Sequence, residues 1–191
     1  MVARDYHIIL ASNSPRRKEL LAGIDVNFDV RVIPDIDESY PASLPTKDIA
    51  EYISRKKAAV YRQQMAADEL IITADTIVVL DSEVMGKPHD EADASRMLRE
   101  LSGRTHQVIT GVTLTTTDRQ QSFSVETDVT FKSLTDEEIN YYIQHYKPFD
   151  KAGAYGIQEW IGHIWVTALK GSYFNVMGLP VQRIYEALRQ F

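Results

Sequence analysis

Residues 70–80 read LIITADTIVVL, a nearly continuous apolar run that contains one aspartate, and any fold of the chain must bury it. The length of the run and its β-branched residues are typical of a strand. A carboxylate inside such a strand is costly unless it is paired, hydrogen-bonded or bound to a metal. Asp75 is therefore either a structural acid, bonded to backbone amides or to Thr76, or a group with a chemical task.

Strand and helix signals alternate around this run, which predicts an α/β fold with a mixed, twisted sheet flanked by helices. Asp118, Arg119 and Gln120 join two alternating segments into a hairpin, which adds antiparallel pairing. A glycine-rich stretch after residue 150 predicts a loop. The other predicted strands are 6–11, 28–32, 105–117 and 121–131, and the predicted helices begin near Ser14, Thr46, Asp90, Thr135 and Pro180, the second running to about residue 67 and the third to Gly103.

The composition excludes several kinds of function. The 191 residues contain no cysteine, so disulfides, thiolate zinc sites and cysteine nucleophiles are absent and a metal must use oxygen or histidine ligands. The net charge of −6, without a basic block, argues against nucleic-acid binding. No apolar run approaches the ~18 residues of a membrane span, and no targeting segment is visible. We expect a single soluble, cytoplasmic domain over residues 1–191 that does not act on membranes.

The segment 10–21, LASNSPRRKELL, predicts a strand, a tight turn and the start of a helix. Ser14 is suited to the N-cap, and Pro15 to the first helical position. Arg16 and Arg17 then place two permanent charges where they oppose the helix dipole, and this local cost indicates a bound anion. The alternative is a solvated first turn, which is common at helix starts.

A second basic residue is expected inside the protein. Lys57 lies four residues after Ile53 on the apolar face of the predicted helix from Thr46, so its side chain points inward, either to a site or along the core edge. Arg55 and Lys56 lie off that face and are expected in solvent. Lys87, Glu38, His106 and His163 are individually uninformative, and the histidines lack metal-ligand spacing. The common kinase, hydrolase and dehydrogenase motifs are missing.

Five segments, taken together, resemble the Maf family of nucleotide pyrophosphatases: LASNSPRRKELL, TADTIVV, GKP, DKAGAYGIQ and GSYFNVMGLP. They stand in the family's order and spacing over nearly the whole chain. The resemblance implies a fold similar to the inosine-triphosphate pyrophosphatases, with two lobes around a cleft, and a homodimer. It also implies cleavage of a nucleoside triphosphate to the monophosphate and pyrophosphate, with a divalent metal cation, Mg²⁺ or Mn²⁺.

The resemblance also implies roles for particular residues. Asp75 would accept the proton of the attacking water, Lys57 and Lys87 would stabilise charge, and Glu38 and Asp75 would contact the metal. The residues expected to bind the substrate are Ser12, Arg16, Arg17, Thr76 and Gln158. Of these, the positions of Arg16, Thr76 and Gln158 are linked to substrate choice within the family.

The stretch DKAGAYGIQ resembles the subgroup that acts on dTTP and UTP, with CTP or modified pyrimidine nucleotides as further candidates. The amide of Gln158 offers a donor and an acceptor, as the edge of uracil or thymine requires. Glu159 and Trp160 follow, where relatives often have a glycine. The alternative function is a septum regulator that binds a nucleotide or a protein with little turnover.

Overall fold

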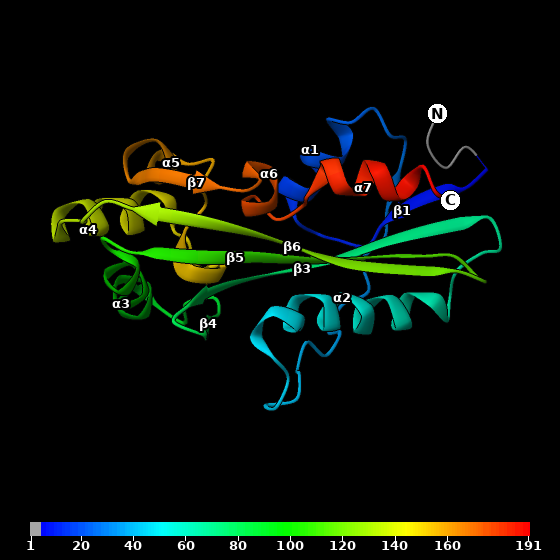
Figure 1. Cartoon of the computed structure of the whole chain (residues 1–191), viewed down its shortest axis with the longest axis horizontal. Helices are drawn as coiled ribbons and strands as arrows, with labels where there is room; N and C mark the ends of the chain where they lie inside the picture. Colours follow the sequence, from blue (N-terminus) through cyan, green and yellow to red (C-terminus); the bar gives the residue numbers. More distant parts are fainter. Residues whose placement is uncertain (1–4) are drawn as a thin grey trace. The chain divides into compact units, whose positions relative to one another are not determined.

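The computed structural model describes residues 5–191, within which seven strands form one sheet flanked by helices (Figure 1). The strand order is β2-β1-β3-β5-β6-β7, and β4 pairs with β3. The predicted α/β class is confirmed. The strands are β1 (His7–Leu10), β2 (Asp29–Val30), β3 (Glu69–Leu80), β4 (Glu83–Met85), β5 (Thr105–Thr115), β6 (Gln120–Phe131) and β7 (Val166–Lys170).

The sheet is mixed because its strands are connected in two ways. β1 pairs in parallel with both β2 and β3, while β4 is antiparallel to β3 and β7 is antiparallel to β6. The tight connection between β5 and β6 makes them the predicted hairpin, with the amide of Thr116 bonded to the carbonyl of Arg119. Every residue of β3 is buried except Asp75 and Thr76, which are half-buried. The apolar run therefore forms the strand that the sequence predicts.

Three of the predicted helix starts follow local capping signals. Ser14 caps α1, Asp90 caps α3, and Thr135, where a helix start was predicted, forms a capping box of α4 with Glu138. The helical elements are α1 (Pro15–Ala22), α2 (Thr46–Arg62), α3 (Glu91–Leu101), α4 (Asp136–Tyr146), η1 (Ala152–Ala154), α5 (Trp160–Ile164), α6 (Tyr173–Val176) and α7 (Val181–Leu188).

Three local predictions were wrong. Helix α2 ends at Arg62, and its N-cap is Pro45, whereas Thr46 is the first helical residue. The strand expected over 28–32 is reduced to Asp29–Val30. The glycine-rich stretch is not a plain loop, because it contains η1, α5, β7 and α6. These elements have three to five residues each, too few for a hydrophobic period to stand out.

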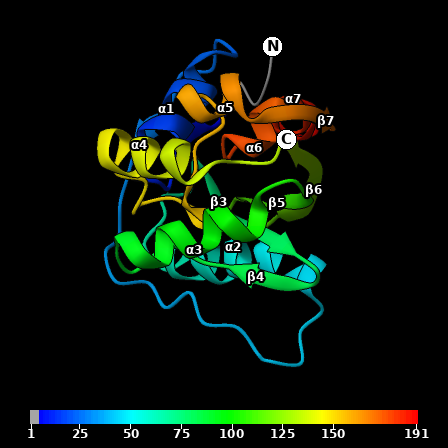
Figure 2. The same ribbon diagram turned by 90° about the vertical axis from the view of Figure 1, so that its left-hand side faces the viewer.

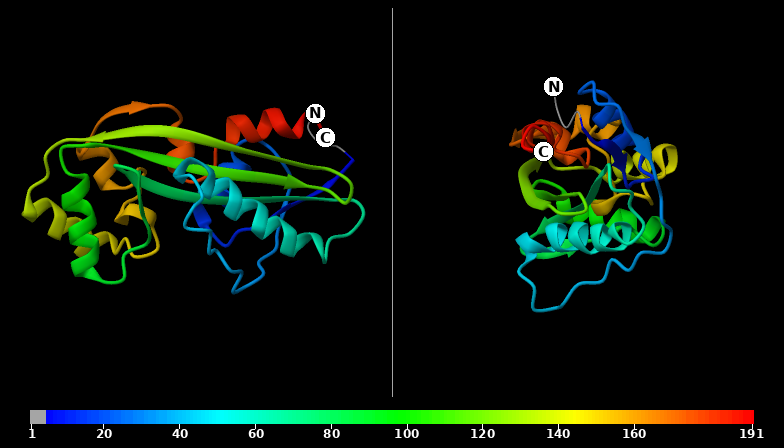
Figure 3. Two further views of the ribbon diagram at one scale, coloured as in Figure 1. Left: turned by 60° about the horizontal axis from the view of Figure 1, so that its bottom comes forward. Right: turned by 90° about the vertical axis from the view of Figure 1, so that its right-hand side faces the viewer.

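The chain forms two compact units. Unit 1 contains the chain up to Asp75 together with Thr110–Val125 and Gly178–Phe191, and unit 2 contains Thr76–Ile109 and Glu126–Met177. In unit 1, α2 covers one face of the sheet, and α1 and α7 cover the other (Figures 1 and 3). In unit 2, α3 contacts both α4 and η1 (Figure 2).

A buried histidine occupies the core of unit 2. His106 on β5 is 1% exposed, and its Nε2 lies 2.6 Å from the hydroxyl oxygen of Tyr155. Its ring packs edge-to-face on Phe131 and Tyr155, with centroid distances of 4.9 Å and 5.3 Å. Burial lowers the pKa of His106 from 6.5 to about 4, so the folded protein favours the neutral ring. His106 is a core residue and is not placed as a metal ligand.

The titration of His106 predicts a loss of stability in mild acid. The pKa of His106 is 6.5 when the chain is unfolded and about 4 when it is folded. Its contribution to the free energy of unfolding is therefore fully present above pH 6.5 and is lost as the pH falls from 6.5 to about 4. The loss should approach about 3 kcal/mol, at 1.36 kcal/mol per pKa unit. Urea unfolding of wild type and His106→Gln at several pH values measures it. Equal pH slopes for the two proteins would contradict this role for His106.

Candidate active site

The start of α1 has the geometry that its sequence predicts. The Ser14 hydroxyl accepts a hydrogen bond from the backbone N–H of Arg17 at 3.5 Å, and Pro15 is the first helical residue. Ser12 is 8% exposed, and its hydroxyl accepts a hydrogen bond from the backbone N–H of Ser14 at 3.2 Å. The start of α1 is therefore preceded by one buried hydroxyl, that of Ser12, and its first turn carries two half-buried arginines, Arg16 and Arg17.

Arg17 is tied to two distant segments of unit 1. Its Nε donates to the carbonyl of Gly178 at 2.8 Å, and one terminal nitrogen donates to the carbonyl of Ala74 at 2.8 Å. Ala74 immediately precedes Asp75, and Gly178 lies shortly before α7. These two hydrogen bonds hold α1 against β3 and the segment before α7.

A carboxylate–lysine cluster lies at the centre of β3. Lys57 on α2 places its Nζ 2.8 Å from Oδ1 of Asp75 and 2.8 Å from Oε1 of Glu38. The side chains of Lys57 and Asp75 are each 13% exposed, whereas that of Glu38 is 55% exposed. The inward direction of Lys57 is as predicted, and the lysine bridges the two predicted metal contacts. Glu38 comes from the long segment between β2 and α2 (Figure 3).

Buried polar contacts fix where Lys57 meets Asp75. Thr73 and Asp75 lie on the same face of β3 because side chains alternate along a strand. The hydroxyl of Thr73 donates to the carbonyl of Ser54 at 2.7 Å, and the Ser54 hydroxyl lies 2.8 Å from that of Thr113. Ser54 precedes Lys57 by three residues, so both lie on one helix face. The Thr73–Ser54 contact therefore sets the register at which Lys57 reaches Asp75.

The electrostatics of Asp75 reflect two opposing causes. Burial raises the pKa of Asp75 above its usual range, and the charge and hydrogen bond of Lys57 oppose this rise. Arg17 also lowers the pKa of Asp75, whereas the nearby Glu38 raises it. A buried carboxylate with a raised proton affinity and a cation beside it is suited to accept a proton.

The other predicted site residues belong to unit 2. Thr76 follows Asp75 on β3 and is half-buried, and Lys87 is exposed in the turn after β4. That turn is held by the backbone N–H of Gly153, which donates to the carbonyl of Gly86 at 3.0 Å. Gln158 is half-buried, and its Oε1 is buried without a hydrogen-bond partner among residues 5–191.

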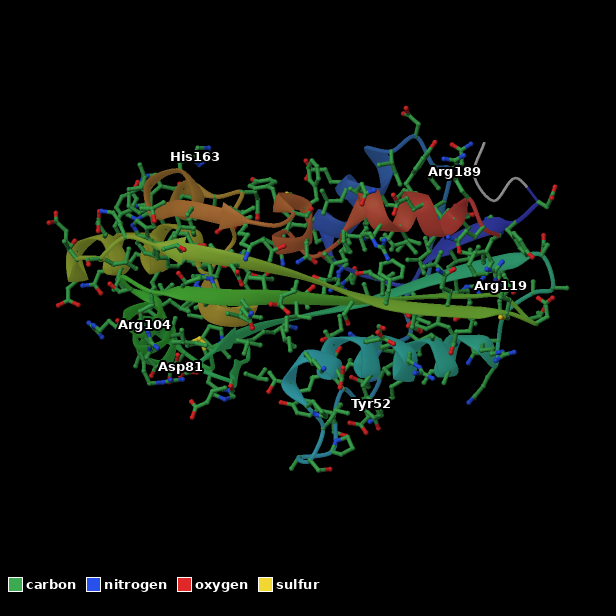
Figure 4. The ribbon with its side chains drawn as sticks, viewed as in Figure 1. Tyr52, Asp81, Arg104, Arg119, His163 and Arg189 are labelled. Atoms are coloured by element: carbon green, nitrogen blue, oxygen red, sulfur yellow. The ribbon has the colours of Figure 1, made fainter. Side chains whose placement is uncertain are left out.

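Several features lie away from this set. A groove on the outer side of α2, lined by residues such as Tyr52, Arg55 and Arg62, contains none of the predicted site residues. Tyr52 points away from the sheet there (Figure 4). Lys56, which was expected in solvent, forms an exposed ion pair, with its Nζ 2.5 Å from Oδ2 of Asp37. His163 is exposed, and its Nδ1 lies 3.0 Å from the backbone carbonyl of Glu159.

Sequence reasoning did not foresee two sets of contacts near the predicted residues. The hydrogen bonds of Arg17 to the backbone carbonyls of Ala74 and Gly178 join segments that are distant in sequence, so no local sequence pattern predicts them. Lys151, Glu159 and Tyr142 form a partly buried polar cluster next to Gln158, and the only signal for it was the acid at Glu159 where relatives often have a glycine.

Arg104 and Asp81 form a further ion pair in unit 2, on the surface (Figure 4).

These observations define a mixed α/β protein with a carboxylate–lysine site next to a basic helix start. The sequence model of the family described as Maf-like protein matches residues 7–191, and the chain belongs to this family. It is 64% identical to a protein of Phocaeicola vulgatus named dTTP/UTP pyrophosphatase, over 97% of this chain and 96% of that one. A protein of the same name from Bacteroides thetaiotaomicron is 58% identical over the same shares.

Two solved structures were also found to be similar. The Ham1 protein of Staphylococcus aureus aligns with a TM-score of 0.46 and 15% identity, covering 65% of this chain and 71% of that one. A nucleoside-triphosphatase / dITP/XTP pyrophosphatase of Mycobacterium abscessus aligns with a TM-score of 0.42 and 13% identity, covering 74% and 95%.

Proposed function

We propose that this protein hydrolyses nucleoside triphosphates to the monophosphate and pyrophosphate, with dTTP and UTP as preferred substrates. The observation that carries the proposal is Asp75, with a side chain only 13% exposed and paired with Lys57, in a chain that is 64% identical to a dTTP/UTP pyrophosphatase. A reaction at the α-phosphorus needs an oriented water, a proton acceptor and cations around the phosphate oxygens. Unit 1 contains side chains for each of these needs.

Asp75 takes the proton of the attacking water in this mechanism. Burial raises the pKa of Asp75 and so increases its proton affinity, as suits a general base, while the charge and hydrogen bond of Lys57 oppose this rise. The ammonium of Lys57 stabilises negative charge that develops on the phosphate oxygens, and Lys87 is assigned the same role. Ser12, Arg16 and Arg17 bind the triphosphate at the start of α1, where backbone N–H groups and guanidinium groups favour anions.

Asp75 and Glu38 fit the ligand chemistry of a divalent cation. Mg²⁺ is commonly bound by one or two carboxylates together with substrate phosphates, and these two acids approach each other through their shared contact with Lys57. Among residues 5–191, no group of three or more His, Cys, Asp or Glu side chains is arranged to hold a metal. When bound, Mg²⁺ or Mn²⁺ would neutralise phosphate charge and polarise the reacting phosphoryl group.

Gln158 is assigned to the recognition of the base. The buried Oε1 of Gln158 lacks a donor within the described part of the chain, and the N3–H of uracil or thymine would supply one. A site built on such a bond rejects a base with the wrong edge by leaving a buried polar group unpaired. Arg16 and Thr76 are the other residues assigned to substrate choice.

Removal of Gln158 should flatten the preference for pyrimidines. We expect the kcat/KM ratio of UTP to GTP to fall about 5- to 150-fold in Gln158→Ala, because each unpaired group costs roughly 1–3 kcal/mol. The assay is a panel of dTTP, UTP, CTP, ATP and GTP with Mg²⁺ or Mn²⁺, with pyrophosphate as the measured product. If wild type and variant show the same ratio, this amide does not read the base.

Within the described residues, no helix combines the length and apolar character that a membrane crossing requires. The homodimer, the cytoplasmic location and the lack of nucleic-acid or membrane partners stay predictions from the sequence.

A further inference from the structure

The segment that carries Gln158 is closed by an ion pair at its two ends. Lys151 is 8% exposed, and its Nζ lies 3.1 Å from Oε1 of Glu159. The Glu159 side chain is 19% exposed, so this pair is largely removed from solvent. Since Gln158 directly precedes Glu159, the pair closes a loop over residues 151–159 and holds the end at which Gln158 stands.

A buried tyrosine joins this loop to helix α4. The Tyr142 hydroxyl donates a hydrogen bond to Oε2 of Glu159 and accepts one from the backbone N–H of Gly156 at 3.1 Å. Tyr142 is 0% exposed, and burial raises its pKa far above the usual range, which keeps the hydroxyl protonated as a donor. One hydroxyl therefore binds the loop at its middle and at its end. The backbone N–H of Glu159 donates to the carbonyl of Gly156 at 3.0 Å and tightens the same turn.

Gly156 brings the Gln158 amide next to this network. A Cβ atom on Gly156 would lie 2.9 Å from Nε2 of Gln158 and 3.1 Å from Cε of Lys151. The amide and the lysine stem therefore both lie against the same glycine. A shift of the Lys151–Glu159 pair would move the surroundings of the Gln158 amide directly.

We propose that Lys151, Glu159 and Tyr142 are positioning residues that fix the Gln158 amide and thereby set the discrimination between pyrimidine and purine nucleotides. This inference rests on the proposed function, because it assumes that Gln158 reads the base. A buried ion pair is weak evidence for net stability, whereas a fully hydrogen-bonded polar network holds its members in one geometry. Recognition by a hydrogen bond depends on such geometry, whereas the reacting groups around Asp75 are held by other contacts.

The test uses two variants of this network and one matched control. Glu159→Gln keeps the side-chain shape but removes the charge that faces Lys151, and Tyr142→Phe removes the hydroxyl that bonds Glu159 and Gly156. The control is Asp150→Asn. Asp150 pairs with the same Lys151 ammonium at 2.8 Å, but it is 62% exposed and adjacent in sequence, so this pair closes no loop. Each protein is assayed with UTP and GTP at a temperature where circular dichroism shows it folded.

We expect the UTP/GTP ratio of kcat/KM to fall about 5- to 30-fold in Glu159→Gln and in Tyr142→Phe, with kcat for UTP reduced less than about threefold. Asp150→Asn should keep the ratio within about twofold. A purely structural role would lower the melting temperature and scale both substrates equally, so the ratio separates the two roles.

Three further outcomes would overturn the inference, and they differ in what they imply for the proposed function. A wild-type pyrimidine preference that both network variants retain would overturn the inference and leave the function standing. No pyrimidine preference in wild type would overturn both. An equal fall of the ratio in Asp150→Asn would show that charge near Lys151, and not loop closure, sets the ratio, and would also overturn the inference.

Discussion

Asp75→Asn should lose about a hundredfold to ten-thousandfold in kcat and keep a melting temperature close to that of wild type. The amide has nearly the shape of the carboxylate, but it cannot take a proton from water and is a poor ligand for a divalent cation. Lys57 retains Glu38 as an ion-pair partner, 2.8 Å away, so the variant leaves no isolated buried charge on α2. Steady-state kinetics with UTP and thermal unfolding by circular dichroism measure the two effects.

Asp37→Asn provides a matched control for this prediction. Asp37 lies on the same loop as Glu38, but it pairs with Lys56 and is 68% exposed. Its removal should change kcat less than about twofold, because an exposed ion pair contributes little. Near-normal turnover in a folded Asp75→Asn protein would refute the assignment of the base. Parallel loss of activity and stability would reduce Asp75 to a structural acid.

Gly111→Ala should destabilise the protein by about 3 kcal/mol or more and reduce the yield of folded protein. A Cβ atom on Gly111 would lie 2.2 Å from the carbonyl carbon of Ala50 and 2.2 Å from the backbone nitrogen of Glu51. Both atoms belong to the backbone of α2, which cannot yield as a flexible side chain would. The substitution would push α2 away from β5, and with it the helix that carries Lys57.

Gly86→Ala is the control for this effect, because a Cβ atom there would meet nothing within 4 Å. Urea unfolding of wild type, Gly111→Ala and Gly86→Ala gives the free energy of unfolding of each protein. Gly86→Ala should stay within about 0.5 kcal/mol of wild type, as surface substitutions usually do. A Gly111→Ala protein as stable as the control would show that α2 does not approach β5 as closely as described.

The parts of the site that were predicted from sequence are those fixed by local patterns. The burial of Asp75 follows from the apolar residues around it in β3, the direction of Lys57 from the helical period, and the start of α1 from the Ser14 cap. Each of these signals lies within a few residues of the feature that it predicts.

The remaining contacts join segments that are distant in sequence, and no local signal specifies them. The sequence predicted that the side chains of Lys57 and Asp75 both point into the protein. It did not predict that the lysine bridges Asp75 and Glu38. Similarly, Arg17 was predicted only to bind an anion, although it also holds backbone carbonyls of β3 and of Gly178. Such pairings depend on how strands and helices pack, which a single sequence leaves open.

The position of bond cleavage tests the proposed reaction most directly. UTP is hydrolysed by the wild-type protein with Mg²⁺ or Mn²⁺ in water enriched in oxygen-18, and the products are analysed by mass spectrometry. Attack of water at the α-phosphorus predicts one heavy oxygen in UMP and none in pyrophosphate. Heavy oxygen in pyrophosphate, or the formation of UDP and orthophosphate, would contradict the account.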